Sequence, residues 1–225
     1  MALNYSQSEE NYLKTIYHLQ VGTSAVTTNE LAERLQTRAA SVTDMMKKLN
    51  AKKLLHYKPY YGFYLSTEGR KIAVNIIRRH RLWEFFLAEK LQFGWNEVHE
   101  VAEQLEHISN KKLIDKLDEY LGFPRVDPHG DPIPDNKGKI KSSSEVPLSE
   151  LPHCVLAEVK RVSHQTNEML EILQHKNIGI GTKLEIRKYF EFDHSYEIKA
   201  KNNTVTISEQ LAKNIFVTYE LQSRQ

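Results

Sequence analysis

The spacing of apolar residues changes from helical to strand-like along this chain, and that change constrains the fold most. Up to Leu121 the apolar residues recur every three or four positions, as on one face of a helix. From Val155 onward they occur in short alternating runs, as in strands. The intervening segment, residues 123–152, is rich in Pro, Gly, Ser and Lys, which is the composition of a linker. The sequence predicts a mainly α protein with a C-terminal all-β part.

Two capping boxes mark the first two helices. Ser6 with Glu9 opens a helix that runs to Gln20, and Thr27 with Glu30 opens a short second one. A third helix is indicated by apolar residues at helical spacing: Val42, Met45, Met46 and Leu49. Short helices joined by a tight connection predict a helix-turn-helix.

A β-hairpin and a long helix follow. Residues 54–57 and 63–65 predict two strands joined by a turn, which is the wing of a winged helix-turn-helix. The helix that begins at Thr67 and runs to about Leu91 has more apolar surface than one small domain can cover, so we expect a dimer interface there. A helix capped by Asn96 and another over residues 111–121 complete the helical part.

The C-terminal part is predicted to be a small antiparallel barrel with one helix at about Gln165 to Leu173. Its strands are expected at residues 155–162, 183–187, 196–200, 204–207 and 215–219. We divide the chain into a winged helix-turn-helix DNA-binding domain (1–74), a helical dimerisation and metal-binding domain (75–124), a linker (125–152) and the barrel domain (153–225).

The single cysteine, Cys154, excludes a disulfide framework within one subunit and a zinc site built on several thiolates. We interpret it as a buried strand residue. No apolar run approaches the roughly 20 residues that span a membrane, and residues 1–10 lack the features of a signal peptide. We therefore expect a cytoplasmic protein without a membrane partner.

Positive charge is concentrated in one region. Residues 40–81 contain ten Lys or Arg and two acids, whereas the whole chain has a net charge of only +2. This asymmetry favours a polyanion such as double-stranded DNA as partner of that region. The alternative to a polyanion partner, for a basic run considered alone, is a helix face that is simply exposed to solvent.

The third helix offers a polar outer face that would suit base edges near its start and phosphates further along. The candidate DNA-contacting residues are Arg38, Ser41, Thr43, Asp44, Lys47 and Lys48, with Lys58, Tyr60 and Tyr61 at the wing tip. A helix-turn-helix used only for packing remains the alternative.

Two groups of potential metal ligands lie at helical spacing after the wing. His80 and Glu84 fall in an apolar row that predicts burial, so a divalent cation would compensate them. The second group falls within an arc of about 100° on one helix face; it comprises His99, Glu103, Glu106 and His107. Imidazole and carboxylate without thiolate suit manganese, iron, cobalt, nickel or zinc, and carboxylate-rich sites lean toward manganese. A purely structural cluster is the alternative.

An enzyme is not expected. The chain contains no His-Glu-x-x-His of the kind found in hydrolases, and its helical part lacks the paired Glu-x-x-His of di-iron bundles.

These motifs resemble, in order and over nearly the whole chain, the iron- and manganese-dependent repressors typified by the diphtheria toxin repressor and the manganese transport regulator. The resemblance is carried by residues 10–17, Arg78-Arg-His-Arg-Leu82, Val98-His99, Glu106-His107 and His129-Gly-Asp-Pro-Ile-Pro134. It implies a homodimer that represses metal-uptake genes by binding a palindromic operator when metal is present, a C-terminal SH3-like (FeoA-like) barrel, and a partly fixed segment at His129.

The resemblance also implies two metal sites. The primary site would use Asn11, Glu103, Glu106 and His107, and the ancillary site would use His80, Glu84 and His99 with Gln165 and Glu168 from the barrel domain. Glutamate at position 103 is typical of the manganese branch, so Mn²⁺ is favoured and Fe²⁺ is the alternative.

Two positions depart from the family pattern. Asn11 stands where the branches carry methionine or aspartate, so either its amide oxygen or Glu10 could be the ligand. Lys14 replaces a second glutamate of the manganese branch, which puts a paired manganese site in doubt. A metal-independent winged-helix regulator, and a metalloenzyme with a nucleic-acid-binding module, remain as rival functions.

Overall fold

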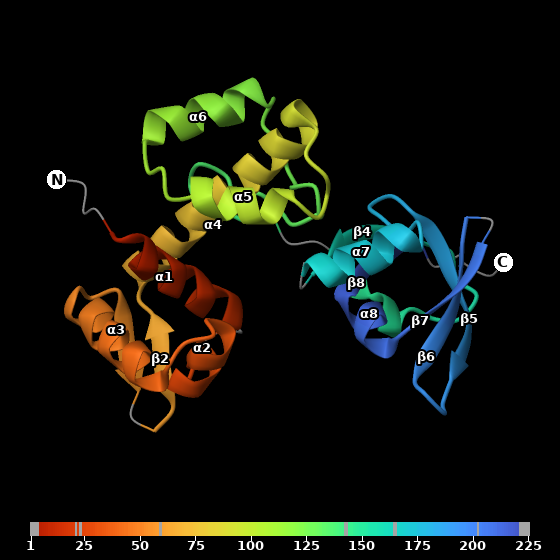
Figure 1. The fold of residues 1–225 in the computed structure, drawn as a ribbon, viewed down its shortest axis with the longest axis horizontal. Coiled ribbons are helices and arrows are strands. Elements are labelled where there is room, and N and C mark those ends of the chain that lie inside the picture. The colour runs from red at the N-terminus through yellow and green to blue at the C-terminus, as the bar shows by residue number, and fades with distance from the viewer. Residues whose placement is uncertain are drawn as a thin grey trace. The chain divides into compact units, whose positions relative to one another are not determined.

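The computed structural model describes residues 5–20, 22, 24–58, 60–141, 144–163, 166–201 and 203–220 (Figure 1). The chain forms two compact units, each assembled from several segments. The first unit comprises residues 1–80, 103–116 and 134–139, and the second comprises residues 81–102, 117–133 and 140–225. Each candidate site below lies within one of these units.

The first unit contains the predicted winged helix-turn-helix. Its elements are α1 (Gln7–Leu19), α2 (Thr28–Arg34), α3 (Ala39–Ala51), β1 (Leu55–Lys58), β2 (Gly62–Leu65) and the start of α4 (Thr67–Leu91). Both predicted capping boxes are formed, at Ser6 and Thr27. The helices and the hairpin enclose an apolar core in which Leu13, Met46 and Leu49 are fully buried. The helix-turn-helix and wing predictions are confirmed.

The wing is tied to the segment before α2 close to its turn, because Phe63 is one position from the last strand pair of the hairpin. Val26 and Phe63 exchange two backbone hydrogen bonds, with N···O distances of 2.7 and 2.9 Å. Tyr60 at the tip is fully exposed and has a φ of +66°. The hairpin is therefore held next to its turn, while the Tyr60 side chain is exposed to solvent.

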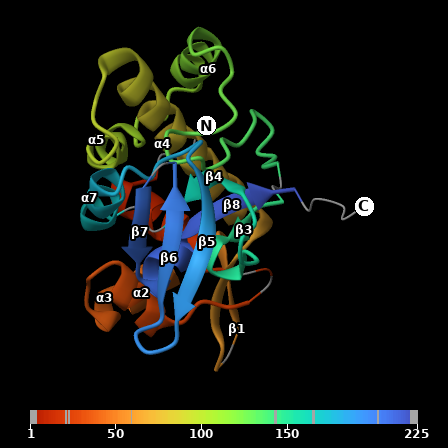
Figure 2. The same ribbon diagram turned by 90° about the vertical axis from the view of Figure 1, so that its right-hand side faces the viewer.

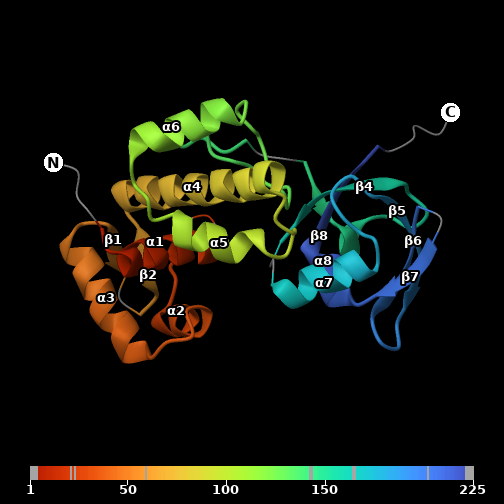
Figure 3. The ribbon, with the colours of Figure 1, turned by 45° about the horizontal axis from the view of Figure 1, so that its top comes forward.

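Three helices follow the wing (Figure 3). Helix α4 is continuous over the length expected, and α5 (Val98–Leu105) and α6 (Lys111–Tyr120) come after it. The prediction that four ligands share one helix face is wrong, because α5 ends at Leu105. Glu106 and His107 lie in the turn that follows, so α5 does not fix their direction.

The second unit contains the all-β part (Figure 2). Its six strands are β3 (Val146–Pro147), β4 (Ala157–Val162), β5 (Lys183–Phe190), β6 (Ser195–Ala200), β7 (Asn203–Ile207) and β8 (Ile215–Tyr219). They pair antiparallel in the order β3-β8-β4-β5-β6-β7. Register shifts in β4 and β5 mark irregularities that add curvature to the sheet.

Two helices accompany this sheet. Helix α7 (Asn167–His175) was expected, but α8 (Glu209–Asn214) was not, although Ser208 caps it by accepting a hydrogen bond from the Leu211 amide. Cys154 is exposed, so its interpretation as a buried residue is wrong. It lies in a turn before β4, with a φ of +59°.

Part of the Pro- and Gly-rich segment is firmly packed. Asp127 and His129 are buried, and Val126 forms an antiparallel bridge with Pro132. Gly130 has a φ of +87°, and a Cβ atom there would lie 1.9 Å from the carbonyl oxygen of Lys160. Only glycine allows the backbone to approach β4 this closely.

We expect Gly130→Ala to lower the free energy of unfolding by about 2–3 kcal/mol, because it combines a left-handed conformation with a backbone clash. Urea unfolding followed by circular dichroism measures this change. Gly122→Ala is the matched control, since Gly122 has a φ of +75° and open space around its Cα. Equal losses in the two variants would contradict the role assigned to the contact with Lys160.

Candidate metal centres and nucleic-acid interface

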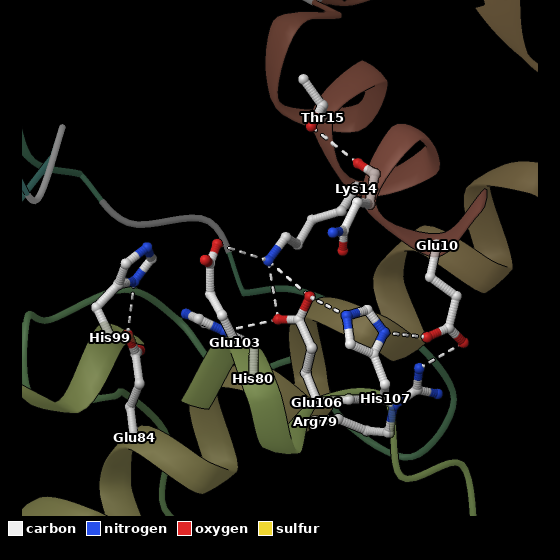
Figure 4. A network of polar contacts seen from close by, with 11 residues as sticks. Glu10, Lys14, Thr15, Arg79, His80, Glu84, His99, Glu103, Glu106 and His107 are labelled. Carbon is white, nitrogen blue, oxygen red and sulfur yellow. Dashed lines mark hydrogen bonds and ion pairs between the residues drawn. The ribbon is translucent and has the colours of Figure 1, made fainter. Parts of the chain in front are cut away.

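A network of charged side chains lies in the first unit, and we call it the Glu106 cluster (Figure 4). It joins α1, α4 and the end of α5, and its members are Glu10, Lys14, Arg79, His80, Glu103, Glu106 and His107. Three of the four residues expected in the primary metal site are among them. Asn11, the fourth, is exposed on α1.

Glu106 is the centre of this cluster and is fully buried. Lys14 Nζ donates to both carboxylate oxygens, at 2.7 and 2.8 Å, and His80 Nδ1 lies 2.7 Å from Oε2. Burial raises the pKa of Glu106, but the hydrogen bond from His80 and the charge of Lys14 outweigh it and hold the pKa below its ordinary value. The carboxylate is therefore ionised and closely surrounded by donors.

Glu10 is held in a similar way. Its Oε1 accepts a hydrogen bond from Arg79 Nη2 at 2.9 Å, and its Oε2 accepts one from His107 Nδ1 at 2.6 Å. The other ring nitrogen of His107 lies 3.9 Å from Glu106 Oε1, so this imidazole connects two carboxylates. Arg79 Nε also donates to the carbonyl oxygen of Glu106. The sequence did not indicate a role for Arg79.

The fit of the Glu106 cluster to a metal ion depends on Lys14. The ammonium group already lies among the carboxylates of Glu103 and Glu106, at 3.4 Å and 2.7 Å. Glu10 is likewise paired, with Arg79. Carboxylates that are compensated by permanent cations do not form an open ligand set for a divalent ion.

A second group lies in the second unit, and we call it the Glu84 cluster: Glu84, His99, Asp127 and His129. Glu84 Oε1 is 3.1 Å from His99 Nδ1 and 4.0 Å from His129 Nδ1. Ligand atoms of Glu84, Asp127 and His129 lie within 4.8 Å of one another, and all three residues are buried. The resemblance implied Glu84 and His99 as ligands, but Asp127 and His129 were not among the residues expected.

The hydrogen bonding of His129 defines which of its nitrogens could hold a metal. Nε2 lies 3.0 Å from the carbonyl oxygen of Trp95, which can only accept, so Nε2 carries the hydrogen. Nδ1 is buried without a hydrogen-bond partner and faces the Glu84 carboxylate. Burial lowers the pKa of His129 although the charge of Glu84 opposes this, so the neutral imidazole presents a lone pair to a carboxylate. A cation between the two would relieve that repulsion.

Asp127 lies beside Glu84 and His129 and forms hydrogen bonds within its own loop. Its Oδ1 accepts hydrogen bonds from the amides of His129 and Asp131, at 2.8 and 3.0 Å. Burial and the charges of Glu84 and Asp131 raise the pKa of Asp127 well above its ordinary value, and Arg81 opposes them. The added charge of a divalent ion would favour the ionised form.

The ancillary site was also expected to contain His80, Gln165 and Glu168. His80 lies one turn before Glu84 on α4, and its Nδ1 is paired with Glu106. Glu168 is exposed on α7, and Gln165 lies outside the described residues. The part of the chain that the structure describes therefore supplies His129 and Asp127, rather than a residue of α7, to the buried group around Glu84.

The expected DNA-binding face lies on α3 and the wing. Arg38, Ser41, Asp44 and Lys47 are exposed there, and Lys58 Nζ stands 4.2 Å from the ring centroid of Tyr61. Thr43 is half-buried and its hydroxyl donates to the Ala39 carbonyl oxygen. A groove of about 590 Å³ runs between α2, α3 and the hairpin; Asn29, Thr43, Lys47, Asn50, Tyr57 and Tyr60 are among its lining residues.

Lys48 differs from its neighbours because it is paired inside the protein. Its Nζ lies 3.2 Å from Oε1 of the buried Glu9, and Lys52 Nζ lies 2.6 Å from the same oxygen. Burial raises the pKa of Glu9, but the hydrogen bonds from Lys52, Ser6 and Lys48 lower it to about 2. These contacts attach α3 and the residue that follows it to α1.

We expect Glu9→Gln to lower the free energy of unfolding by about 2 kcal/mol at pH 7, allowing for the partial exposure of both lysines. The folded pKa lies below the ordinary value of 4.5, so this stabilisation is complete above pH 4.5 and disappears as the pH falls through about 2. Urea unfolding across this pH range measures it, with the exposed Glu33→Gln as control. A difference from wild type that did not change with pH would contradict this assignment.

Comparison with known proteins agrees with this architecture. Residues 4–63 match the iron dependent repressor N-terminal DNA binding domain, residues 66–135 match the metal binding and dimerisation domain of the same repressors, and residues 146–219 match the FeoA domain. The diphtheria toxin repressor of Corynebacterium efficiens is 30% identical over 189 residues, which cover 79% of this chain and 81% of that protein. The chain belongs to the iron-dependent repressor family.

Members of both metal branches are similar to this iron-dependent repressor homologue. The transcriptional regulator MntR of Oceanobacillus iheyensis is 30% identical over 138 residues, covering 61% of this chain and 92% of that protein. A manganese-dependent transcriptional repressor solved in complex with manganese has a TM-score of 0.86 at 30% identity, covering 94% of this chain and 100% of that one. The structure of ScaR with bound Zn²⁺ has a TM-score of 0.81 at 32% identity, covering 94% and 99%.

The predicted family and fold class are confirmed, and the relatives are metal-dependent transcriptional repressors with DNA-binding domains rather than enzymes. Among the described residues, no helix is long and apolar enough to cross a membrane.

Proposed function

We propose that the protein is a metal-dependent transcriptional repressor that binds a palindromic operator as a homodimer and controls metal-uptake genes. The observation that carries this proposal is the Glu84 cluster, in which two buried acceptors, Glu84 Oε1 and His129 Nδ1, face each other 4.0 Å apart. Such a pair is unfavourable without a cation. It lies within a chain whose family is defined by metal-dependent DNA binding.

In this proposal Glu84, His129 and Asp127 hold the metal, with His99 beside them. Carboxylate and imidazole ligands without thiolate favour Mn²⁺, and Fe²⁺ is the alternative. Similarity to manganese-dependent and iron-dependent repressors supports both ions. When bound, the metal supplies positive charge that draws α4, the start of α5 and the loop at Asp127 together.

The link to DNA binding is thermodynamic. A metal that binds the DNA-competent conformation more tightly shifts the population toward it, by no more than the difference between its two affinities. Two recognition helices of a dimer enter successive major grooves about 34 Å apart. The charged outer face of α3, with Lys47 exposed, supports this use of the helix.

Two rival functions make different predictions. A metal-independent winged-helix regulator would bind its operator equally well with a chelator, and the Glu84 cluster would then be purely structural. A metalloenzyme with a nucleic-acid-binding module would turn over a phosphoester or peptide substrate. Genomic fragments retained by the purified protein with Mn²⁺, with anaerobic Fe²⁺ and with chelator would separate these functions and identify the operator.

We expect Glu84→Gln to abolish the increase in operator affinity that Mn²⁺ produces, because the substitution removes the anionic ligand and keeps the side-chain shape. Fluorescence anisotropy of the labelled operator, titrated with and without Mn²⁺, measures this. The control is Glu89→Gln, an exposed glutamate on the same helix. A normal Mn²⁺ response in the Glu84 variant would show that the metal binds elsewhere.

We expect Lys47→Ala to weaken operator binding and to reduce the dependence of log K on log salt by about 1, as for the loss of one phosphate contact. Operator titrations in Mn²⁺ at several salt concentrations measure this slope. Lys111→Ala is the matched control, because Lys111 is also exposed and paired with an acid on its own helix. An unchanged slope would exclude a phosphate contact by Lys47.

A further inference from the structure

Lys14 occupies the point at which the carboxylates of the Glu106 cluster converge (Figure 4). Its Nζ lies 2.7 and 2.8 Å from the two oxygens of Glu106 and 3.4 Å from Glu103 Oε1. The side chain is 13% exposed, and that of Glu106 is fully buried. The ammonium group thus has the position and the partners of a bound cation, although it belongs to α1.

Each acid of the cluster already has a cationic side chain as a neighbour. Glu10, Glu103 and Glu106 are acidic, while Lys14 and Arg79 are permanently positive and lie within hydrogen-bond distance of them. His80 and His107 add two further ring nitrogens at 2.7 and 2.6 Å from the carboxylates of Glu106 and Glu10. A divalent ion at Glu106 would have to enter next to an ammonium group in surroundings that screen charge poorly, so the repulsion would be strong.

We propose that Lys14 is a built-in cation that replaces a metal ion in the Glu106 cluster. The cluster then fastens α1 to the turn after α5 permanently, and metal binding is confined to the Glu84 cluster. The chain departs here from the manganese branch that it resembles, in which a glutamate is typical at this position. The inference rests on the proposed metal-dependent function, because it states which of two clusters responds to metal.

The test is the number of Mn²⁺ ions bound per subunit of the full-length protein, measured by equilibrium dialysis and by the electron paramagnetic resonance of free Mn²⁺. We expect about one ion for wild type and about two for Lys14→Met, which removes the charge and keeps much of the side-chain length. The affinity of the second site should rise about tenfold or more over wild type. Lys14→Arg, which keeps a permanent cation, should remain at about one.

Combined variants locate each ion. In Lys14→Met the gained ion should disappear when Glu106→Gln is added and should persist when Glu84→Gln is added. In the wild-type background, Glu84→Gln should remove the ion and Glu106→Gln should leave it in place. Thermal unfolding with and without Mn²⁺ gives a second readout, because a bound ion raises the midpoint of each variant that retains a site.

Two results would overturn the proposal: loss of an ion from wild type on Glu106→Gln, or a Lys14→Met protein that still binds only about one. If Lys14→Met does not fold, the effect of Glu106→Gln on wild type decides alone. Failure of the proposed function would look different, because wild type would then bind no Mn²⁺ at Glu84 or would bind operator equally well with chelator.

Discussion

The burial of glutamate carboxylates is the constraint on which the helical part of this protein depends. Glu9, Glu10, Glu84 and Glu106 are all at least 94% buried, and a buried charge without a partner is strongly destabilising. Each of the four meets a group from a different helix or from a distant turn, as Glu106 does with Lys14 across 92 positions of the sequence. Because each buried acid requires a particular partner, these contacts select one arrangement of α1, α3, α4 and α5 over other ways of packing the same apolar faces.

The protein compensates these acids in two ways. Glu9, Glu10 and Glu106 are matched by lysine or arginine, whose charges do not depend on any ligand. Glu84 lies 3.1 Å from a nitrogen of His99 and 4.0 Å from Nδ1 of His129, which presents a lone pair. An acid that is paired with lysine or arginine favours one fixed structure. An acid that faces another hydrogen-bond acceptor favours the state in which a cation is bound between them. Whether a buried acid only stabilises the fold or also responds to a ligand therefore depends on which side chain lies next to it.

Much of the fold could be predicted because its signals are local. Capping boxes, the helical spacing of apolar residues and the alternation of apolar and polar residues in strands each depend on residues within one element. The winged helix, the long helix and the all-β part were therefore anticipated. The resemblance implied the pairing of Glu84 with His99, but Asp127 and His129 were not expected beside them, because their approach depends on tertiary contacts. His129 was missed as a ligand because it lies in a segment with linker composition, although its family motif suggested a fixed conformation. The length of α5 was overestimated since helical spacing alone does not reveal where a helix ends.

The two backbone hydrogen bonds between Val26 and Phe63 attach the hairpin to the rest of the winged domain close to its turn. The hairpin is also held at its other end, where Leu55 and Leu65 lie in the apolar core, so both ends of the strand pairing are fixed to the winged domain. The aromatic ring of Tyr60 at the tip is therefore presented on a supported turn, and it lines the same groove as Thr43 and Lys47 of α3. A surface that docks on this face would therefore meet α3 and the wing as one body, and could not adjust to one of them without moving the other.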